Sequence, residues 1–135
     1  MTDKPSVVFF GNERIATGLD KTNLPRLNKL VENGYKIDAI FSPSKKATSR
    51  NEHSFEVFEF AKKHNISIHT DYSQSELQNI LNNLPAQVGI LVAYGKIVPQ
   101  SVIDNFKYGI INIHPSLLPK YRGSTPIETA ILDGV

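Results

Sequence analysis

The sequence contains no cysteine, no apolar run of membrane-spanning length and no large excess of charge of either sign. The absence of cysteine excludes a disulfide framework and cysteine-ligated metals, and it favours the cytosol. No apolar run approaches the roughly 18 residues of a membrane span, and the polar start M-T-D-K-P is not typical of a signal peptide. Fifteen Lys and Arg against 13 Asp and Glu give a net charge of +2, which does not by itself demand a nucleic-acid partner. We therefore expect a soluble, cytoplasmic monomer.

The remaining composition is that of an ordinary globular domain. The chain has 135 residues, of which 40% are hydrophobic, 21% charged and 9% aromatic. That length suffices for one domain with a hydrophobic core of its own. The sequence shows no repeats, low-complexity tracts or interdomain linkers, so we expect a single domain over residues 1–135.

Apolar patterns along the chain alternate between strand-like and helix-like. Helical spacing marks 24–31, with Gly34 placed to close that helix, and 77–84, while a short helix is expected from Pro99 to Phe106. Phe55, Phe58 and Ala61 are expected on one face of another helix, and Thr125 begins a capping box before a last one. Strands are expected at 7–10, 37–41, 66–70, 88–93 and 109–114. This alternation predicts an α/β fold, a Rossmann-like parallel sheet with helices on both faces.

Several candidate sites have weak sequence support. Gly11 follows a strand and precedes a helix, but its spacing to Gly18 fits neither glycine-rich phosphate-binding motif, so a tight-turn glycine is the better interpretation. The histidines at 53, 64 and 69 have no second histidine or acid at metal-ligand spacing, so we expect them to be solvated or packed and expect no metal site.

The segment from Gly109 to Gly123 carries the strongest candidate site. Its first residues form a β-branched strand that Pro115 ends. Side chains alternate across a strand with period two, so Asn112 and His114 are expected on the same face. Ligands of open α/β sheets bind at the carboxyl ends of the strands, where these two residues would lie. An amide donor and an imidazole are suited to stabilising charge on oxygen and to moving a proton.

Residues 112–127, N-I-H-P-S-L-L-P-K-Y-R-G-S-T-P-I, resemble the formyltransferases that use 10-formyltetrahydrofolate. The segments V-V-F-F-G at 7–11 and I-L-V-A-Y-G-K-I-V-P at 90–99 are similar to that family's first strand and folate-side loop. Within the family, L-L-P-K-Y-R-G-S-T-P-I resembles the branch that formylates initiator methionyl-tRNA rather than the glycinamide ribonucleotide branch.

The resemblance implies roles for the matching residues. Asn112 and His114 correspond to two of the family's three catalytic residues, Asn112 donating a hydrogen bond to the oxyanion and His114 stabilising it or moving the proton. The formyl donor, 10-formyltetrahydrofolate, would contact the turn Ser116, Leu117, Leu118 and Pro119, and the backbone from Tyr94 through Gly95 and Ile97 to Pro99.

The family's third catalytic residue, an aspartate on a later loop, has no counterpart within residues 1–135, and neither does the C-terminal β domain of the methionyl-tRNA branch. We therefore expect this chain to be the amino-terminal catalytic domain, truncated before both, with very low activity alone. Asp133 follows the wrong element to replace the aspartate.

Three interpretations remain open from the sequence. The first is a methionyl-tRNA formyltransferase, the second a formyltransferase acting on an amino sugar nucleotide, and the third a folate-binding module without turnover. Lys45, Lys46 and Arg50 form a basic cluster that would suit the tRNA backbone, although such a run is more often a solvated loop.

Overall fold

A computed structural model describes residues 4–12, 24–42, 52–113 and 132, with the backbone alone at 52–55. Within these residues, five parallel strands form one sheet in the order β3-β2-β1-β4-β5. The strands are β1 (Val7–Gly11), β2 (Ile37–Phe41), β3 (Ser67–His69), β4 (Val88–Val92) and β5 (Ile110–Ile113). Their order and direction confirm the Rossmann-like parallel sheet predicted from the sequence.

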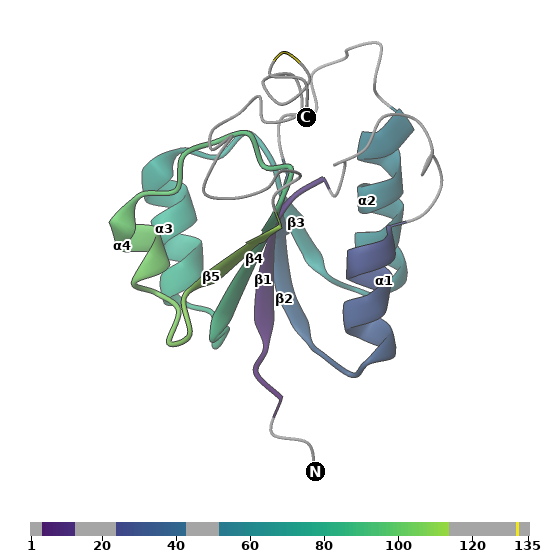
Figure 1. Ribbon diagram of the computed structural model, residues 1–135, viewed down its shortest axis with the longest axis horizontal. Coiled ribbons are helices and arrows are strands. Elements are labelled where there is room, and N and C mark those ends of the chain that lie inside the picture. The colour runs from purple at the N-terminus through teal and green to yellow at the C-terminus, as the bar shows by residue number, and fades with distance from the viewer. Residues whose placement is uncertain (1–3, 13–23, 43–51, 114–131, 133–135) are drawn as a thin grey trace.

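Helices cover both faces of this sheet (Figure 1). On the first face lie α1 (Pro25–Glu32) and α2 (Glu52–Lys63), and on the second face lie α3 (Gln74–Asn82) and α4 (Gln100–Ile103). Each helix follows one strand and returns the chain to the start of the next, the arrangement that parallel pairing requires. None of the helices in this part of the chain is both long and apolar enough to cross a bilayer.

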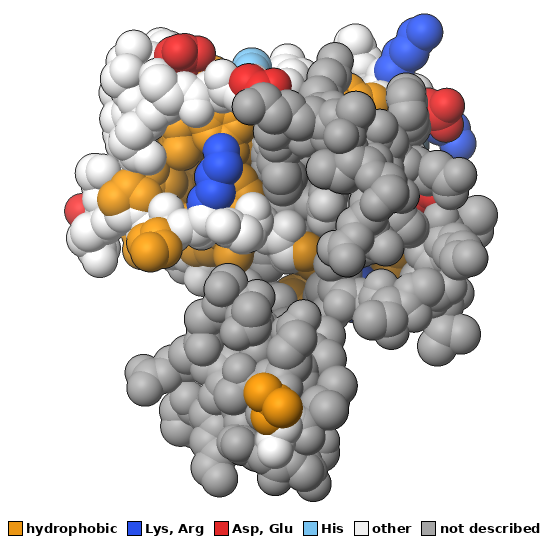
Figure 2. All heavy atoms as spheres, turned by 90° about the horizontal axis from the view of Figure 1, so that it is seen from above, with side chains coloured by type: hydrophobic (Ala, Val, Ile, Leu, Met, Phe, Trp, Pro, Cys, Tyr) orange, Lys and Arg blue, Asp and Glu red, His pale blue; other side chains and the backbone are white. Residues whose placement is uncertain are grey.

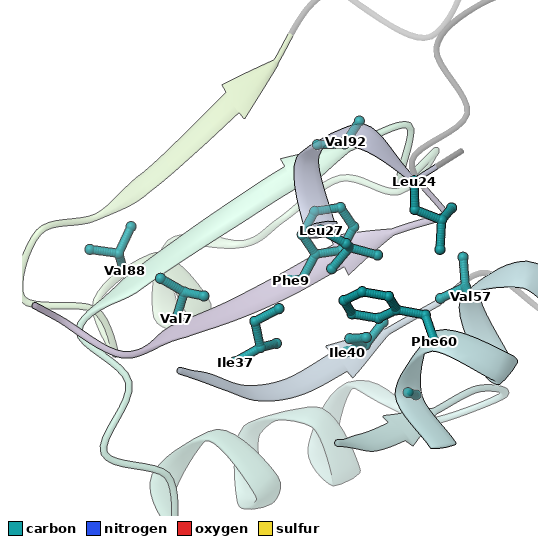
Figure 3. Packing of buried hydrophobic residues seen from close by; sticks show 11 residues of the cluster. Val7, Phe9, Leu24, Leu27, Ile37, Ile40, Val57, Phe60, Val88 and Val92 are labelled. Carbon is teal, nitrogen blue, oxygen red and sulfur yellow. The ribbon is translucent and has the colours of Figure 1, made fainter. Parts of the chain in front are cut away.

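The first face packs a core that is mostly aliphatic. Leu27 from α1 and Phe60 from α2 lie against side chains of β1 and β2 (Figure 3). Phe9 and Ile40 are completely buried there. Burial of this apolar surface is the main force that holds α1 and α2 on the sheet.

The second face packs a core that is rich in aromatic rings. Phe10 is stacked on Phe41, with ring centroids 5.4 Å apart, and meets the edges of Tyr94 and Phe106 at 5.4 and 6.1 Å. Leu77 from α3 and side chains of α4 complete this cluster. Consecutive residues of β1 thus supply the two cores, because side chains alternate across a strand.

The helices expected at 24–31, 77–84 and 99–106 are observed as α1, α3 and α4, but α3 begins three residues earlier than expected and α4 ends three residues earlier. Gly34 closes α1 with φ of 81°. The strands lie within one residue of the expected limits at each end. The expected apolar face of α2 is confirmed only in part: Ala61 is buried and Phe58 is partly buried, but Val57 and Phe60, which the sequence analysis did not name, are buried as well. Phe55 is described by its backbone alone. The helix expected from Thr125 lies outside the described residues.

The carboxyl ends of β1 and β4 mark the point where the strand order reverses, which is where open α/β sheets bind ligands. Gly11 ends β1 there with φ of 120°. A Cβ at this position would lie 1.8 Å from the Val92 carbonyl oxygen of β4, so only glycine fits. The glycine allows the close approach of two strands, and most of the segment in which we expected a tight turn lies outside the described residues.

Candidate active site

Asn112 lies near the carboxyl end of β5 with an exposed side chain. Phe10, Leu91 and Asn112 are in register on the neighbouring strands β1, β4 and β5. Residues in register on parallel strands point to the same face of a sheet. Phe10 and Leu91 pack in the second core, so Asn112 belongs to the second face. Its amide is thus available to a ligand at the ligand-binding end of the sheet.

The β4–α4 loop, residues 93–99, leaves the same end of the sheet. It begins at Ala93, which has φ of 53°, and continues through Tyr94, whose side chain is only 4% exposed. Gly95 follows with φ of 73° and open space where a Cβ would lie. Ile97 is 95% exposed. The loop therefore places one aromatic side chain inward and presents its backbone, together with a large apolar side chain, outward.

A hollow in the surface lies beside this loop. Phe10 and Leu77 line it together with Tyr72, which precedes α3, and Tyr94, Lys96 and Val98 of the loop. Figure 2 looks onto the carboxyl ends of the strands and shows hydrophobic side chains gathered around a basic side chain on this face. Apolar walls with a few polar groups are typical of a site for a flat organic ligand.

Two tyrosine hydroxyls meet at the edge of the hollow, where Tyr72 and Tyr94 are hydrogen-bonded to each other. The Lys96 ammonium lies 4.6 Å from the ring centroid of Tyr72 and 5.9 Å from that of Tyr94, within cation–π range. Burial raises the pKa of both tyrosines, and for Tyr72 the bond to Tyr94 raises it further. Both phenols therefore stay protonated at neutral pH, as donors and acceptors rather than bases.

The structure places only some of the residues that the sequence nominated. Asn112, Gly95 and Ile97 are exposed at the carboxyl end of the sheet, whereas Tyr94 is buried and supports the loop from beneath. The other nominated residues lie outside the described part of the chain: His114, Ser116, Leu117, Leu118, Pro119, Lys45, Lys46 and Arg50.

Sequence reasoning missed Tyr72 and Lys96, which lie in contact with Tyr94. A signal was present, since Tyr72 follows a predicted strand by two residues and Tyr94 follows another by one. Two aromatic residues placed just beyond the carboxyl ends of parallel strands are expected at the same edge of the sheet.

Residues 11–135 match the protein family described as formyl transferase. The chain belongs to this family. Methionyl-tRNA formyltransferase of Rickettsia bellii (strain RML369-C) is 33% identical over 132 residues, which cover 95% of this chain and 41% of that protein. The chain thus spans well under half the length of this curated relative.

Solved structures share the fold of this formyl transferase chain. Glycinamide ribonucleotide transformylase 1 from Geobacillus kaustophilus superposes with a TM-score of 0.69 at 22% identity, over 98% of this chain and 70% of that one. A formyltetrahydrofolate deformylase from Pseudomonas syringae pv. tomato str. DC3000 superposes with a TM-score of 0.72 at 20% identity, over 98% and 43%. Among the described residues, no group of three or more His, Asp or Glu side chains could hold a metal ion.

Proposed function

We propose that the full-length protein transfers the formyl group of 10-formyltetrahydrofolate to the amino group of initiator methionyl-tRNA. The observation that carries the proposal is the placement of Asn112, an exposed amide on the second face of the sheet at the end where the β4–α4 loop presents its backbone. Membership of the formyl transferase family supports the reaction class. The similarity to the methionyl-tRNA formyltransferase of Rickettsia bellii supports the acceptor.

The reaction makes two demands on the site. The acceptor amine forms a new bond to the formyl carbon while the bond from that carbon to the folate nitrogen breaks, and a proton passes from the amine to that nitrogen. Negative charge develops on the formyl oxygen in between. In the proposal, the Asn112 Nδ2–H group donates a hydrogen bond to that oxygen, which an amide does best when charge has developed.

His114 follows Asn112 by two residues and lies outside the described part of the chain. We assign it the second demand, because imidazole titrates near neutrality and suits both proton transfer and stabilisation of an oxyanion as imidazolium. Ser116, Leu117, Leu118 and Pro119, which lie outside the described residues, are assigned to contact with the folate ring system, as is the backbone of the β4–α4 loop. Ile97 fits that assignment, since its exposed side chain offers apolar surface to a flat heterocycle.

Formylation assays with the full-length protein test the catalytic assignment. Asn112→Ala should lower kcat by about 10²–10³-fold, the usual effect of removing an oxyanion donor, and should leave the KM for the formyl donor nearly unchanged. Asn83→Ala is the matched control, because Asn83 also has an exposed amide but lies after α3, at the amino-terminal end of the sheet. A normal kcat in Asn112→Ala would refute the assignment.

The acceptor is tested separately. Wild-type protein is offered initiator methionyl-tRNA or an amino sugar nucleotide with the same donor, and the triple variant Lys45→Ala, Lys46→Ala, Arg50→Ala is assayed with the tRNA over a salt series. Each lost phosphate contact should flatten the salt slope by about one unit and raise the KM for tRNA. Formylation of the amino sugar nucleotide but not of the tRNA would overturn the tRNA assignment. Folate binding without transfer to either acceptor would instead support a folate-binding module without turnover.

A further inference from the structure

Four aromatic rings form a closed circuit at the carboxyl end of the sheet. Phe10 is stacked on Phe41, the edge of Tyr72 meets Phe41 at 5.2 Å, and the edge of Tyr94 meets Phe10 at 5.4 Å. The hydrogen bond between the hydroxyls of Tyr72 and Tyr94 completes the circuit. This bond joins two loops, because Tyr72 follows β3 and Tyr94 follows β4. In the sheet, β2 and β1 lie between these two strands.

The β4–α4 loop packs against the second core at two side chains, the buried Tyr94 and the partly buried Val98. Ala93 holds a left-handed conformation that L-residues rarely adopt, so contacts elsewhere must compensate for its strain. Gly95, Lys96 and Ile97 are exposed. Tyr94 is therefore the buried anchor at the start of the loop, and its hydroxyl is fixed by Tyr72. Lys96, folded over both rings, holds a second point of the loop against the same pair.

We propose that Tyr72 is a positioning residue for the formyl donor, acting through its hydroxyl bond to Tyr94 to hold the backbone at residues 95–98 in the conformation that receives the folate. The proposal rests on the proposed function for the identity of the ligand. Tyr72 need not touch the donor. A loop that is already ordered loses less conformational entropy when the ligand binds, so its ordering lowers the KM rather than raising kcat.

The kinetic test uses the full-length protein with saturating acceptor. Tyr72→Phe keeps the ring and removes only the hydroxyl, and it should raise the KM for 10-formyltetrahydrofolate about fivefold, within the range for one lost hydrogen bond. The kcat should stay within about twofold, because the loop is ordered in the bound complex. Tyr35→Phe is the matched control, since Tyr35 also lies under a lysine, with Lys4 Nζ 5.0 Å from its ring, but at the amino-terminal end of the sheet.

A second variant separates positioning from general destabilisation. Tyr94→Phe removes the other end of the same bond, so the double variant should show a KM no higher than the worse single variant. Independent effects that multiply would contradict a shared bond. An unchanged KM in Tyr72→Phe, beside an active wild type, would overturn the proposal while the proposed function stands.

Hydrogen exchange gives a readout that needs no catalysis. The backbone amides of residues 95–98 should exchange faster in Tyr72→Phe than in the wild type, while those of β1 should not change. Equal exchange at 95–98 would overturn the proposal whatever the enzyme's substrate. A different result would be a wild type that shows no formyl transfer while residues 95–98 still exchange faster in Tyr72→Phe. That result would count against the proposed function and against a role in donor binding, so the two failures are distinguishable.

Discussion

The two faces of the sheet are packed by side chains of different chemistry, although both take residues from the same strands. On the first face, the buried residues include Phe9, Leu27 and Ile40, and most of the cluster is aliphatic. On the second face, Phe10 and its neighbours form aromatic pairs with defined angles, and the cluster includes a hydroxyl pair. The first core depends mainly on shape and buried area, whereas the second depends more on directional contacts.

This difference matches what each face does at the carboxyl end of the sheet. The directional contacts lie beneath the β4–α4 loop, and Asn112 emerges on the same face. Aliphatic packing tolerates small rearrangements, whereas a hydrogen-bonded pair of rings fixes the orientation of what it carries. We infer that the first face is mainly a scaffold and that the second face also positions the site.

The largest effect on stability is expected at Gly11, where β1 closely approaches β4. Gly11→Ala would place a Cβ 1.8 Å from the Val92 carbonyl oxygen, a backbone atom that has no room to move, and should destabilise the fold by more than about 4 kcal/mol. Gly109→Ala is the control, because Gly109 also has a positive φ, of 76°, but has nothing within 4 Å of the new Cβ. Its cost should be about 1–3 kcal/mol. Urea unfolding measures both, and similar costs would contradict the role of the close approach.

The adjacent residues Phe9 and Phe10 allow a direct comparison of the two faces. Both are 0% exposed on the same strand, so replacing either with leucine should cost about 1–3 kcal/mol of stability. Only Phe10→Leu should also raise the KM for the formyl donor, because Tyr94 packs on Phe10 and should shift away from its hydrogen bond with Tyr72. The expected rise is about fivefold, the effect of one lost hydrogen bond. Urea unfolding and donor kinetics measure the two effects. Equal donor KM values for the two variants would mean that the faces do not differ in function.

Much of this architecture was predictable because it depends on local sequence. The apolar runs of β1 and β4 act over a few residues. The start of α3 is also local, since the Ser73 side chain accepts a hydrogen bond from the Glu76 amide, but the apolar spacing alone placed that start at Leu77. Asn112 was nominated from alternation and from a resemblance, and the described residues place it exposed at the expected end of the sheet.

The failures arose where packing between distant segments decides. In α2, the residues 55, 58 and 61 follow a spacing of three that drifts around a helix, whereas Val57, Phe60 and Ala61 have the tighter i, i+3, i+4 spacing that faces the sheet. The bond between Tyr72 and Tyr94 joins residues 22 positions apart, in loops that follow two strands that do not pair with each other. Local sequence indicates that each tyrosine lies beyond the end of a strand, but it does not indicate that the two hydroxyls meet.

The second face should also be sensitive to alkali. Burial raises the folded-state pKa of Tyr72 and Tyr94, so above about pH 10 the unfolded chain releases these protons first and the folded state becomes less stable. The free energy of unfolding should therefore fall as the pH rises past 10, and it should fall less steeply in the double variant Tyr72→Phe, Tyr94→Phe. Urea unfolding at a series of pH values measures the slope. Parallel slopes for wild type and double variant would rule out these two phenols as its source.

The smallest effect is expected in acid, at the outer edge of the same aromatic cluster. His69 of β3 is stacked on Phe41 with ring centroids 5.0 Å apart, and burial lowers its pKa below the ordinary 6.5. The unfolded chain then takes up a proton before the folded state does, so stability is fully present above pH 6.5 and declines as the pH falls below it. His69→Phe keeps the stacked ring and should flatten the decline in urea midpoint between about pH 6.5 and 5.5. The control is His64→Gln, which removes an imidazole packed against Phe60 on the first face and should leave the decline unchanged. A flatter decline in His64→Gln, with no change in His69→Phe, would contradict the assignment to His69.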